Sequence, residues 1–172
     1  MRRRDFIAGA AGLEAAWPLA ARGQQSERVR RVAVLMGYAE TDLAAQAQVA
    51  ALRQELQKLG WEEGRNIRVD VRFPGSDAGR VRATLMELMS HTPDVLVSNT
   101  NLVTAVVQAE VRTIPVIFLT VADPVGSGFV SNETRPNANL TGFANWERSM
   151  SGKWLELFKE VVPSVERVGY MA

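Results

Sequence analysis

The sequence predicts an α/β fold with an open, mostly parallel sheet flanked by helices. Two observations lead to this fold class. Short continuous apolar runs, such as residues 32–36, are typical of strands that are buried on both faces, as in parallel sheets. Segments with the spacing of amphipathic helices alternate with these runs, and parallel strands need such helical crossovers.

The first predicted unit is a strand at 32–36 and the helix that follows it. Thr41 or Asp42 can cap this helix at its N-terminus, and Gly60 can end it. The apolar residues of the helix step by four and three along one face: Ala45, Val49, Leu52, Leu56 and Leu59.

The second unit begins at residues 67–73, where apolar and charged side chains alternate. This alternation predicts a half-exposed strand close to an edge of the sheet. A turn at 74–77 then leads into a helix that has Val81, Leu85 and Leu88 on one face.

The second half of the chain continues the pattern. We expect strands at 94–97, 116–119 and 139–143, with a helix carrying Val103, Val106 and Val107 between the first two.

A last helix begins at Ser149 or Ser151 and stops before Pro163. Met150, Trp154, Leu157, Phe158 and Val161 lie on one of its faces, and the spacing predicts that Trp154 and Leu157 are core residues.

The pattern of residues 1–23 predicts an export signal rather than part of the fold. Arg3-Arg4-Asp5-Phe6-Ile7 looks like a twin-arginine motif, and an apolar run with a small-x-small site at 21–23 follows it. We therefore expect cleavage near Gly23 and a periplasmic product, with Glu14 as an unusual charge inside the apolar run. The other interpretation of this segment is an amphipathic helix.

Charge and cysteine content exclude several classes of function. The whole chain carries a formal charge of +1, and residues 1–23 carry four arginines against two carboxylates, so the remainder carries −1. This balance gives no reason to expect a nucleic acid as a partner. The chain has no cysteine, which excludes disulfides and thiolate zinc sites. We expect neither a cofactor nor a metal.

The candidate site lies in the loops after the strands. In an open parallel sheet, ligands bind outside the carboxyl ends of the strands and near helix N-termini. These loops are rich in hydroxyl, amide and glycine residues, which suit a small polar ligand. The candidate ligand-binding residues are Gly37, Tyr38, Ser98, Asn99, Thr100, Asn101, Ala122, Asp123, Pro124 and Asn145. The alternative is that such residues only cap helices.

Catalysis finds less support in the sequence. His91 is the only histidine, and it lies in a turn away from the strand ends. Met36-Gly37-Tyr38 contains a single glycine and matches neither nucleotide-binding fingerprint. We therefore predict no catalytic residues and expect that the protein is not an enzyme.

Six short stretches of the chain match motifs of one protein family. They are 59–66 (LGWEEGRN), 93–96 (PDVL), 113–116 (TIPV), 123–130 (DPVGSGFV), 139–143 (NLTGF) and 152–157 (GKWLEL). On these stretches the chain resembles the N-terminal part of ABC transporter substrate-binding proteins, in the group related to tryptophan/tyrosine-type periplasmic binding proteins.

The resemblance implies a periplasmic-binding-protein-like lobe of type I, one of two α/β lobes that close on a ligand by hinge motion. Residues 28–166 would form the N-terminal lobe. Residues 167–172 repeat the pattern of 31–36 and would begin a second lobe that this chain lacks.

The resemblance also implies binding rather than catalysis. The ligand would be a small polar solute, such as an amino acid, and the partner would be an ABC transporter permease in the inner membrane. Gly37 and Tyr38 would approach the ligand from the first strand, Asn99, Thr100 and Asn101 would meet it at a helix N-terminus, and Asp123 would take a ligand amine.

Two other functions remain open at this point. One is a flavodoxin- or Rossmann-like enzyme lobe, which would need a phosphate-binding loop. The other is the ligand-sensing domain of a regulator, which the export signal disfavours.

Overall fold

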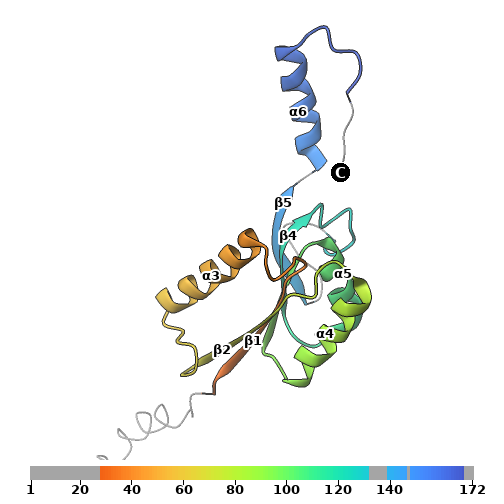
Figure 1. Cartoon of the computed structure of the whole chain (residues 1–172). Helices are drawn as coiled ribbons and strands as arrows, with labels where there is room; N and C mark the ends of the chain where they lie inside the picture. The colour runs from red at the N-terminus through yellow and green to blue at the C-terminus, as the bar shows by residue number, and fades with distance from the viewer. Residues whose placement is uncertain (1–27, 132–138, 147, 169–172) are drawn as a thin grey trace, which may run out of the picture.

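The computed structural model describes residues 28–131, 139–146 and 148–168 (Figure 1). The predicted export signal at 1–23 lies outside these residues, as do the last four of the six residues assigned to a second lobe. The elements in chain order are β1 (Arg30–Leu35), α3 (Leu43–Lys58), β2 (Ile67–Arg72), α4 (Ala78–Ser90), β3 (Val95–Asn99), α5 (Asn101–Glu110), β4 (Val116–Ala122), β5 (Leu140–Trp146) and α6 (Arg148–Val161).

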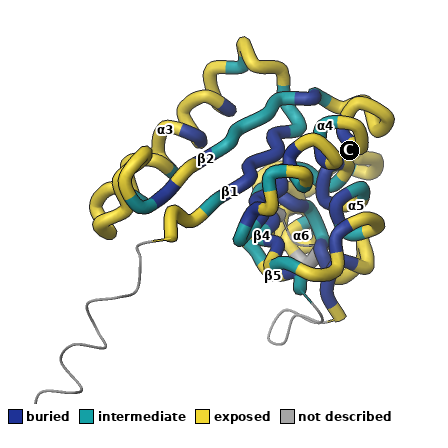
Figure 2. The backbone as a smooth tube through the Cα atoms, turned by 90° about the horizontal axis from the view of Figure 1, so that it is seen from below, coloured by how far each residue is buried: buried dark blue, intermediate teal, exposed yellow. Residues whose placement is uncertain are grey.

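The strands form one five-stranded sheet in the order β2-β1-β3-β4-β5, and every neighbouring pair is parallel. The predicted fold class is therefore confirmed. β2 is an edge strand, as its alternating sequence predicted. Figure 2 shows the consequence, since β1 is buried along most of its length whereas β2 is mostly of intermediate burial.

Helices cover the two faces of the sheet unequally. The larger core cluster lies on the side of α4 and α5, and it contains Val81, Leu85 and Leu88, as predicted. The smaller cluster lies on the side of α3, where Ala45 and Val49 are the buried residues of that helix. The α4 and α5 side therefore contributes more of the buried apolar surface that stabilises the fold.

An aspartate caps the N-terminus of each of the helices α3 and α4. The Asp42 carboxylate accepts hydrogen bonds from the backbone N–H groups of Ala44 at 2.8 Å and Ala45 at 2.9 Å. Asp77 caps α4 in the same way, through the N–H of Arg80 at 2.8 Å. Gly60 follows α3 at a φ of +86°, a conformation that glycine adopts without strain.

A pair of bulges interrupts the pairing of β4 with β5. Phe118 pairs with Gly142 and Val121 with Ala144, so β4 has one extra residue in this interval. Ala122 then pairs with Trp146, so β5 has the next extra residue. Bulges bend a strand and redirect its side chains, and they are frequent beside functional sites.

The last helix differs from its prediction. α6 stands clear of the sheet in Figure 1, and Trp154 and Leu157 are 49% and 58% exposed. The prediction that they are core residues is therefore wrong for this chain, because no described element lies against their face. Ser149 and Ser151 lie inside the helix rather than at its start. Among the described helices, none is long and apolar enough to cross a membrane.

Candidate functional site

The sheet order places a topological switch point between β1 and β3. The chain leaves β1 toward β2 on one side and leaves β3 toward β4 on the other. The loops after β1 and β3 therefore diverge, and the space outside their carboxyl ends is where open α/β sheets bind ligands. Gly37 and Thr100 are the residues of these two loops that meet.

Gly37 packs directly against Thr100. A Cβ atom at Gly37 would collide with Thr100 Oγ1 and would lie 3.0 Å from Thr100 Cγ2 and 3.1 Å from Val103 Cγ2. Both branches of the threonine side chain, Oγ1 and Cγ2, thus face this position. The close approach of the two loops therefore requires glycine at position 37.

Asn99 is the polar centre of this edge. It is fully buried at the end of β3. Its Nδ2 donates to Thr120 Oγ1 at 2.5 Å and to Gln48 Oε1 at 3.2 Å. Its Oδ1 is also buried but accepts no hydrogen bond from any described residue. A buried acceptor without a donor destabilises the protein, typically by about 1–3 kcal/mol, so it calls for an explanation.

Thr100 holds a strained backbone at the start of α5. Its φ of +72° and ψ of 157° lie in a region that is nearly exclusive to glycine. Its side chain makes no capping hydrogen bond to α5. The first N–H groups of the helix are thus not capped by this side chain, and their dipole favours an anionic group.

Asn101 connects α5 to the end of β4. Its Nδ2 donates to the carbonyl of Ala122 at 2.8 Å and to Ser127 Oγ at 3.1 Å, while its Oδ1 accepts from the N–H of Ala122 at 2.9 Å. Both ends of the amide are therefore used within the protein. This predicted ligand residue holds the loop after β4 in place.

Asp123 and Pro124 shape the turn that follows β4. Asp123 has a φ of +44°, and its Oδ1 accepts from the N–H of Gly126 at 2.9 Å. Pro124 is buried, and its carbonyl accepts from the N–H of Phe129 at 2.9 Å. The Asp123 carboxylate thus caps its own turn while lying next to the candidate site.

Three other predicted residues have different environments. Ser98 is fully buried, and its hydroxyl pairs with that of Thr104 at 2.9 Å, so it is a core residue. Tyr38 is half-buried against the core cluster on the α3 side. Asn145 is exposed and lies at the bulge of β5.

The sequence reasoning missed Gln48 and did not single out Thr120. Gln48 is three residues after Ala45 and next to Val49, so the helical spacing alone could have placed it beside the sheet-facing stripe. Thr120 carries no such signal. It reaches Asn99 because the β4 bulge gives it a φ of +50°.

Three cavities lie away from this edge. One of 330 Å³ lies between the end of α3 and β2, one of 740 Å³ lies at the amino ends of the strands, and one of 390 Å³ lies beside α5 and the turn after β4. None of the three is lined by Gly37, Asn99 or Thr100. Within the described residues, no group of three acidic, histidine or cysteine side chains could hold a metal ion.

Charged residues occupy the opposite edge, at the amino ends of β1 and β3. Asp94 accepts from the backbone N–H of Arg31 at 2.9 Å and pairs with the guanidinium groups of Arg28 and Arg30, each at 3.2 Å. The backbone hydrogen bond from Arg31, with help from Arg30 and Arg28, holds the pKa of Asp94 below its usual range against the opposing effect of burial.

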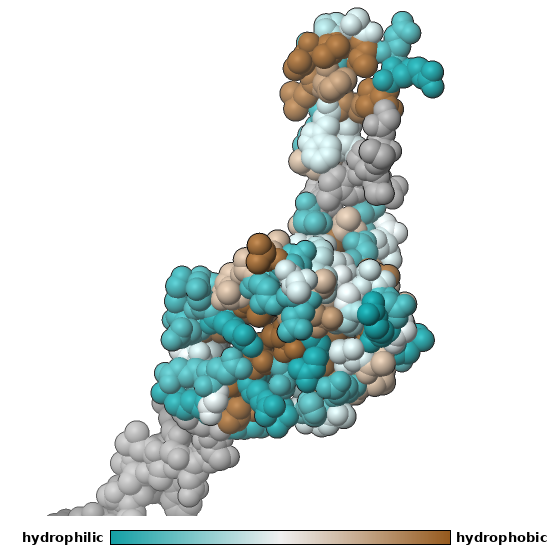
Figure 3. All heavy atoms as spheres, viewed as in Figure 1, coloured by the Kyte–Doolittle hydropathy of each residue, from teal (hydrophilic) through white to brown (hydrophobic). Residues whose placement is uncertain are grey.

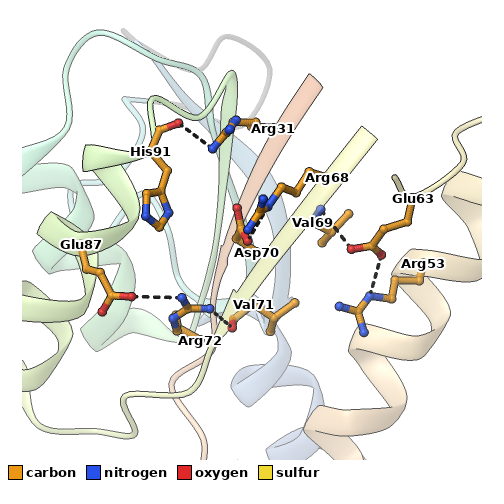
Figure 4. Close-up of polar contacts among 10 residues, drawn as sticks. All are labelled: Arg31, Arg53, Glu63, Arg68, Val69, Asp70, Val71, Arg72, Glu87 and His91. Carbon is orange, nitrogen blue, oxygen red and sulfur yellow. Dashed lines mark hydrogen bonds and ion pairs between the residues drawn. The ribbon is translucent and has the colours of Figure 1, made fainter. Parts of the chain in front are cut away.

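Figure 4 shows further polar contacts, at this edge and along β2. Arg31 donates to the carbonyl of His91 at 3.3 Å, and Arg68 pairs with Asp70 on β2 at 3.1 Å. The Arg68–Asp70 contact is an ion pair near the surface, and such pairs stabilise a fold by about 0–1 kcal/mol.

Solved structures share this fold. A conserved domain protein from Vibrio cholerae superposes with a TM-score of 0.69 at 28% identity, over 80% of this chain and 45% of that one. The ABC domain of a Streptococcus pneumonia protein in complex with L-Trp superposes with a TM-score of 0.67 at 20% identity, again over 80% and 45%. A ligand-free, open substrate-binding protein with adhesive properties from Clostridium difficile gives 0.66 at 22% identity, over 79% and 45%.

Sequence comparisons agree with the fold. A tyrosine-binding protein of Clostridioides difficile is 25% identical over 114 residues, which are 66% of this chain but only 32% of that protein. The chain therefore spans about a third of the length of this curated relative. The family model for ABC transporter substrate-binding proteins matches residues 32–172, nearly the whole chain outside the predicted signal. The chain belongs to the ABC transporter substrate-binding protein family.

Proposed function

We propose that this chain is the N-terminal lobe of a solute-binding protein that serves an ABC uptake transporter, and that its part of the solute site lies between the carboxyl ends of β1, β3 and β4. The observation that carries the location is the buried Oδ1 of Asn99, which accepts no hydrogen bond from the described residues. It adjoins the strained Thr100 at the start of α5. A polar solute would supply the donor that this edge lacks.

The chemistry of the edge suits a zwitterionic solute. The N-terminus of α5 favours a carboxylate, and the carboxylate of Asp123 favours an ammonium group. Tyr38 supplies an aromatic surface near the loop after β1. Two relatives carry tyrosine and L-Trp in their names, which supports an amino acid as the solute class.

The proposed mechanism is binding by two lobes. Residues 28–166 form one lobe, residues 167–172 begin the second, and hinge closure traps the solute between them. The 45% share of each solved structure that this chain covers is consistent with one lobe of two. The closed form would then be presented to a permease in the inner membrane. Among the described residues, the single glycine after β1 gives no support to a nucleotide-binding enzyme lobe.

Export through residues 1–23 completes the proposal, with a periplasmic product that begins near Gln24. Replacing both Arg3 and Arg4 with Lys should block export, because the translocase recognises the arginine pair. Cell fractionation measures this directly. Normal periplasmic delivery of the double variant would refute the twin-arginine assignment.

Nuclear magnetic resonance on the chain itself tests the site. Titrating tyrosine or tryptophan into ¹⁵N-labelled protein should shift the amide signals of Gly37, Asn99, Thr100 and Asp123. Binding should be weak, because one lobe supplies half of a two-sided site.

A test variant and a matched control variant check the location of the site. Asn99→Leu should abolish the shifts, whereas Asp94→Asn at the opposite edge should leave them intact. Shifts that centre on the charged edge around Asp94, or that survive Asn99→Leu, would contradict the proposed location.

A protein extended through a second lobe tests the function. Its true solute should stabilise it by about 2.7 kcal/mol at a hundredfold excess over the dissociation constant. The present chain should show almost no thermal stabilisation. Tight binding by the single lobe would contradict the proposal that this chain supplies only half of the solute site.

A further inference from the structure

Gln48 on α3 reaches the buried amide of Asn99 from outside the sheet. Figure 3 shows that the surface over α3 is largely hydrophilic, so an exposed glutamine on this helix is ordinary by itself. Gln48 differs because Asn99 Nδ2 donates to its Oε1 at 3.2 Å, across 51 positions of the chain. Ala45 and Val49, the buried residues of α3, hold this part of the helix against the core. The backbone at position 48 is therefore fixed, whereas its side chain can change without disturbing the core.

The amide of Asn99 has two ends, and the described residues satisfy only one of them. Its Nδ2 donates to Gln48 Oε1 and to Thr120 Oγ1, the latter at 2.5 Å. Its Oδ1 accepts nothing from the described residues. Asn99 is fully buried, so a hydrogen bond to this oxygen would form in a place with little water, where it is electrostatically strong. The chemical character of the unpaired end therefore decides which solute group binds here.

The same three side chains can also form hydrogen bonds the other way round. A glutamine amide can turn to present its NH₂ group, and a threonine hydroxyl can donate as well as accept. The Asn99 amide would then turn over, its Oδ1 would accept from Gln48 and Thr120, and its NH₂ group would be the unpaired end. An unpaired oxygen suits an ammonium group, whereas an unpaired NH₂ group suits a carboxylate. Because Thr120 can serve either arrangement, the group at position 48 decides between them.

We propose that Gln48 is a positioning residue of the solute site, which turns the Asn99 amide so that its oxygen receives the ammonium group of the solute. Gln48 presents its Oε1 to Asn99, and this arrangement leaves Asn99 Oδ1 unpaired. An ammonium group has three N–H donors, so a bond to Asn99 leaves two for other acceptors such as the Asp123 carboxylate. The solute carboxylate would lie at the N-terminus of α5, whose dipole favours an anion. This inference rests on the proposed function, since it assigns the solute groups within that site.

Two charged variants at position 48 set the orientation of the amide in opposite senses. A glutamate can only accept, so Gln48→Glu should keep the NH₂ group of Asn99 toward α3 and its oxygen toward the solute. A lysine can only donate, so Gln48→Lys should turn the amide over. Because position 48 is exposed, both variants should keep the thermal midpoint of the unaltered chain. Ala47→Glu and Ala47→Lys place the same charges on the neighbouring exposed residue and separate the effect of charge from that of the hydrogen bond.

Nuclear Overhauser effects report the orientation of the amide without any solute. In the unaltered chain and in Gln48→Glu, the Nδ2 protons of Asn99 should give cross-peaks to the methyl group of Thr120, because the two side chains are hydrogen-bonded through Nδ2. In Gln48→Lys these cross-peaks should weaken, because the NH₂ group then faces away from Thr120. Cross-peaks of full strength in Gln48→Lys would overturn the role of Gln48.

Two fragments of tyrosine test which solute group meets Asn99. Tyramine keeps the ammonium group and lacks the carboxylate, whereas hydroxyphenylpropionate keeps the carboxylate and lacks the ammonium group. With the unaltered chain and with Gln48→Glu, tyramine should shift the side-chain amide signals of Asn99, and hydroxyphenylpropionate should not. Gln48→Lys should weaken tyramine binding by about tenfold, the effect of losing one hydrogen bond to a charged group, and should let hydroxyphenylpropionate shift these signals. Both Ala47 variants should keep the preference of the unaltered chain.

The outcomes separate this inference from the proposed function. If tyrosine shifts the amide signals of Gly37 and Thr100 but Gln48→Lys keeps the preference for tyramine, the solute site stands and the role of Gln48 is overturned. A preference of the unaltered chain for hydroxyphenylpropionate at Asn99 would overturn it equally. If tyrosine, tryptophan and both fragments shift no signals at this edge, the proposed site and the inference fail together.

Discussion

The two edges of the parallel sheet differ in how their polar groups are satisfied. At the amino edge, Asp94 accepts a backbone hydrogen bond and pairs with two arginines. At the carboxyl edge, amides and hydroxyls accompany the carboxylate of Asp123. There Asn99 Oδ1 accepts nothing from the described residues, and Thr100 is strained. The amino edge has one exception, the buried Nδ1 of His91, which also lacks a described partner.

This difference agrees with the proposal that the carboxyl edge binds the solute, whereas the amino edge serves stability. Charged pairs between β1 and β3 hold the strands together where the chain enters them. Strain and an unmet acceptor at the other edge lower stability, and such features persist where function requires them. Four substitutions test this contrast.

Gly37→Ala should have the largest effect. The new Cβ would collide with Thr100 Oγ1 and crowd Val103, so the loops after β1 and β3 must separate. We expect a loss of about 3 kcal/mol in the free energy of unfolding, measured by urea titration. Combining it with Thr100→Gly should recover most of the loss. An alanine variant as stable as the unaltered chain would show that the loops are not tightly packed.

Asn101→Ala should follow, with a loss of about 2 kcal/mol. The N–H of Ala122 loses its side-chain acceptor, and the carbonyl of Ala122 loses its shorter side-chain donor and keeps only Ser127 Oγ at 3.3 Å. The control is Asn145→Ala, an exposed asparagine that should leave the unfolding midpoint unchanged. A loss of stability in Asn101→Ala alone would show that Asn101 has a structural role. An Asn101→Ala variant as stable as the unaltered chain would leave Asn101 as a candidate ligand residue.

Thr100→Gly should stabilise the chain by about 1 kcal/mol. Relief of the strained backbone contributes about 1–3 kcal/mol, and the greater freedom of glycine in the unfolded chain removes about 0.5–1 kcal/mol of this gain. Thr113→Gly, at an exposed site without a positive φ, should instead be slightly destabilising. Thermal midpoints decide between these outcomes, and equal behaviour of the two variants would mean that Thr100 is not strained.

Asp94→Asn should have the smallest effect, about 1 kcal/mol near neutral pH. The folded pKa of Asp94 lies below its reference value of 3.8. The stabilisation by the carboxylate is therefore full above about pH 4 and is lost as the pH falls through the folded pKa. Urea midpoints of the two proteins should differ from pH 5 to 7 and converge in more acidic solution. Glu55→Gln, in an exposed ion pair, should change little. A difference in urea midpoint that stays constant down to about pH 2 would show that the ionised Asp94 carboxylate is not its cause.

The parts of the fold that local chemistry controls could be predicted. Asp42 and Asp77 cap helices because their side chains reach N–H groups two or three residues away. Val81, Leu85 and Leu88 are buried because a helix with one apolar face must turn it inward. These outcomes depend on spacing along the chain, which the sequence displays.

The site was only partly predictable. The strand-end rule predicted that Asn99 and Thr100 lie at the carboxyl edge of the sheet, where the structure has them, because the order of strands and helices determines which loops share an edge. The unmet Oδ1 of Asn99 and its bonds to Gln48 and Thr120 depend on groups 51 and 21 residues away. No local pattern signals such a meeting.

The sequence by itself determined the fold class, the caps and the edge of the sheet that holds the candidate site, because periodicity and turn chemistry are local properties. Only the tertiary structure decided that Ser98 faces the core, that Asn101 holds a loop and that Trp154 and Leu157 remain exposed on α6. The physical reason is that an apolar stripe shows which face of a helix seeks burial, but burial itself requires a partner surface that lies elsewhere in the fold or in another molecule.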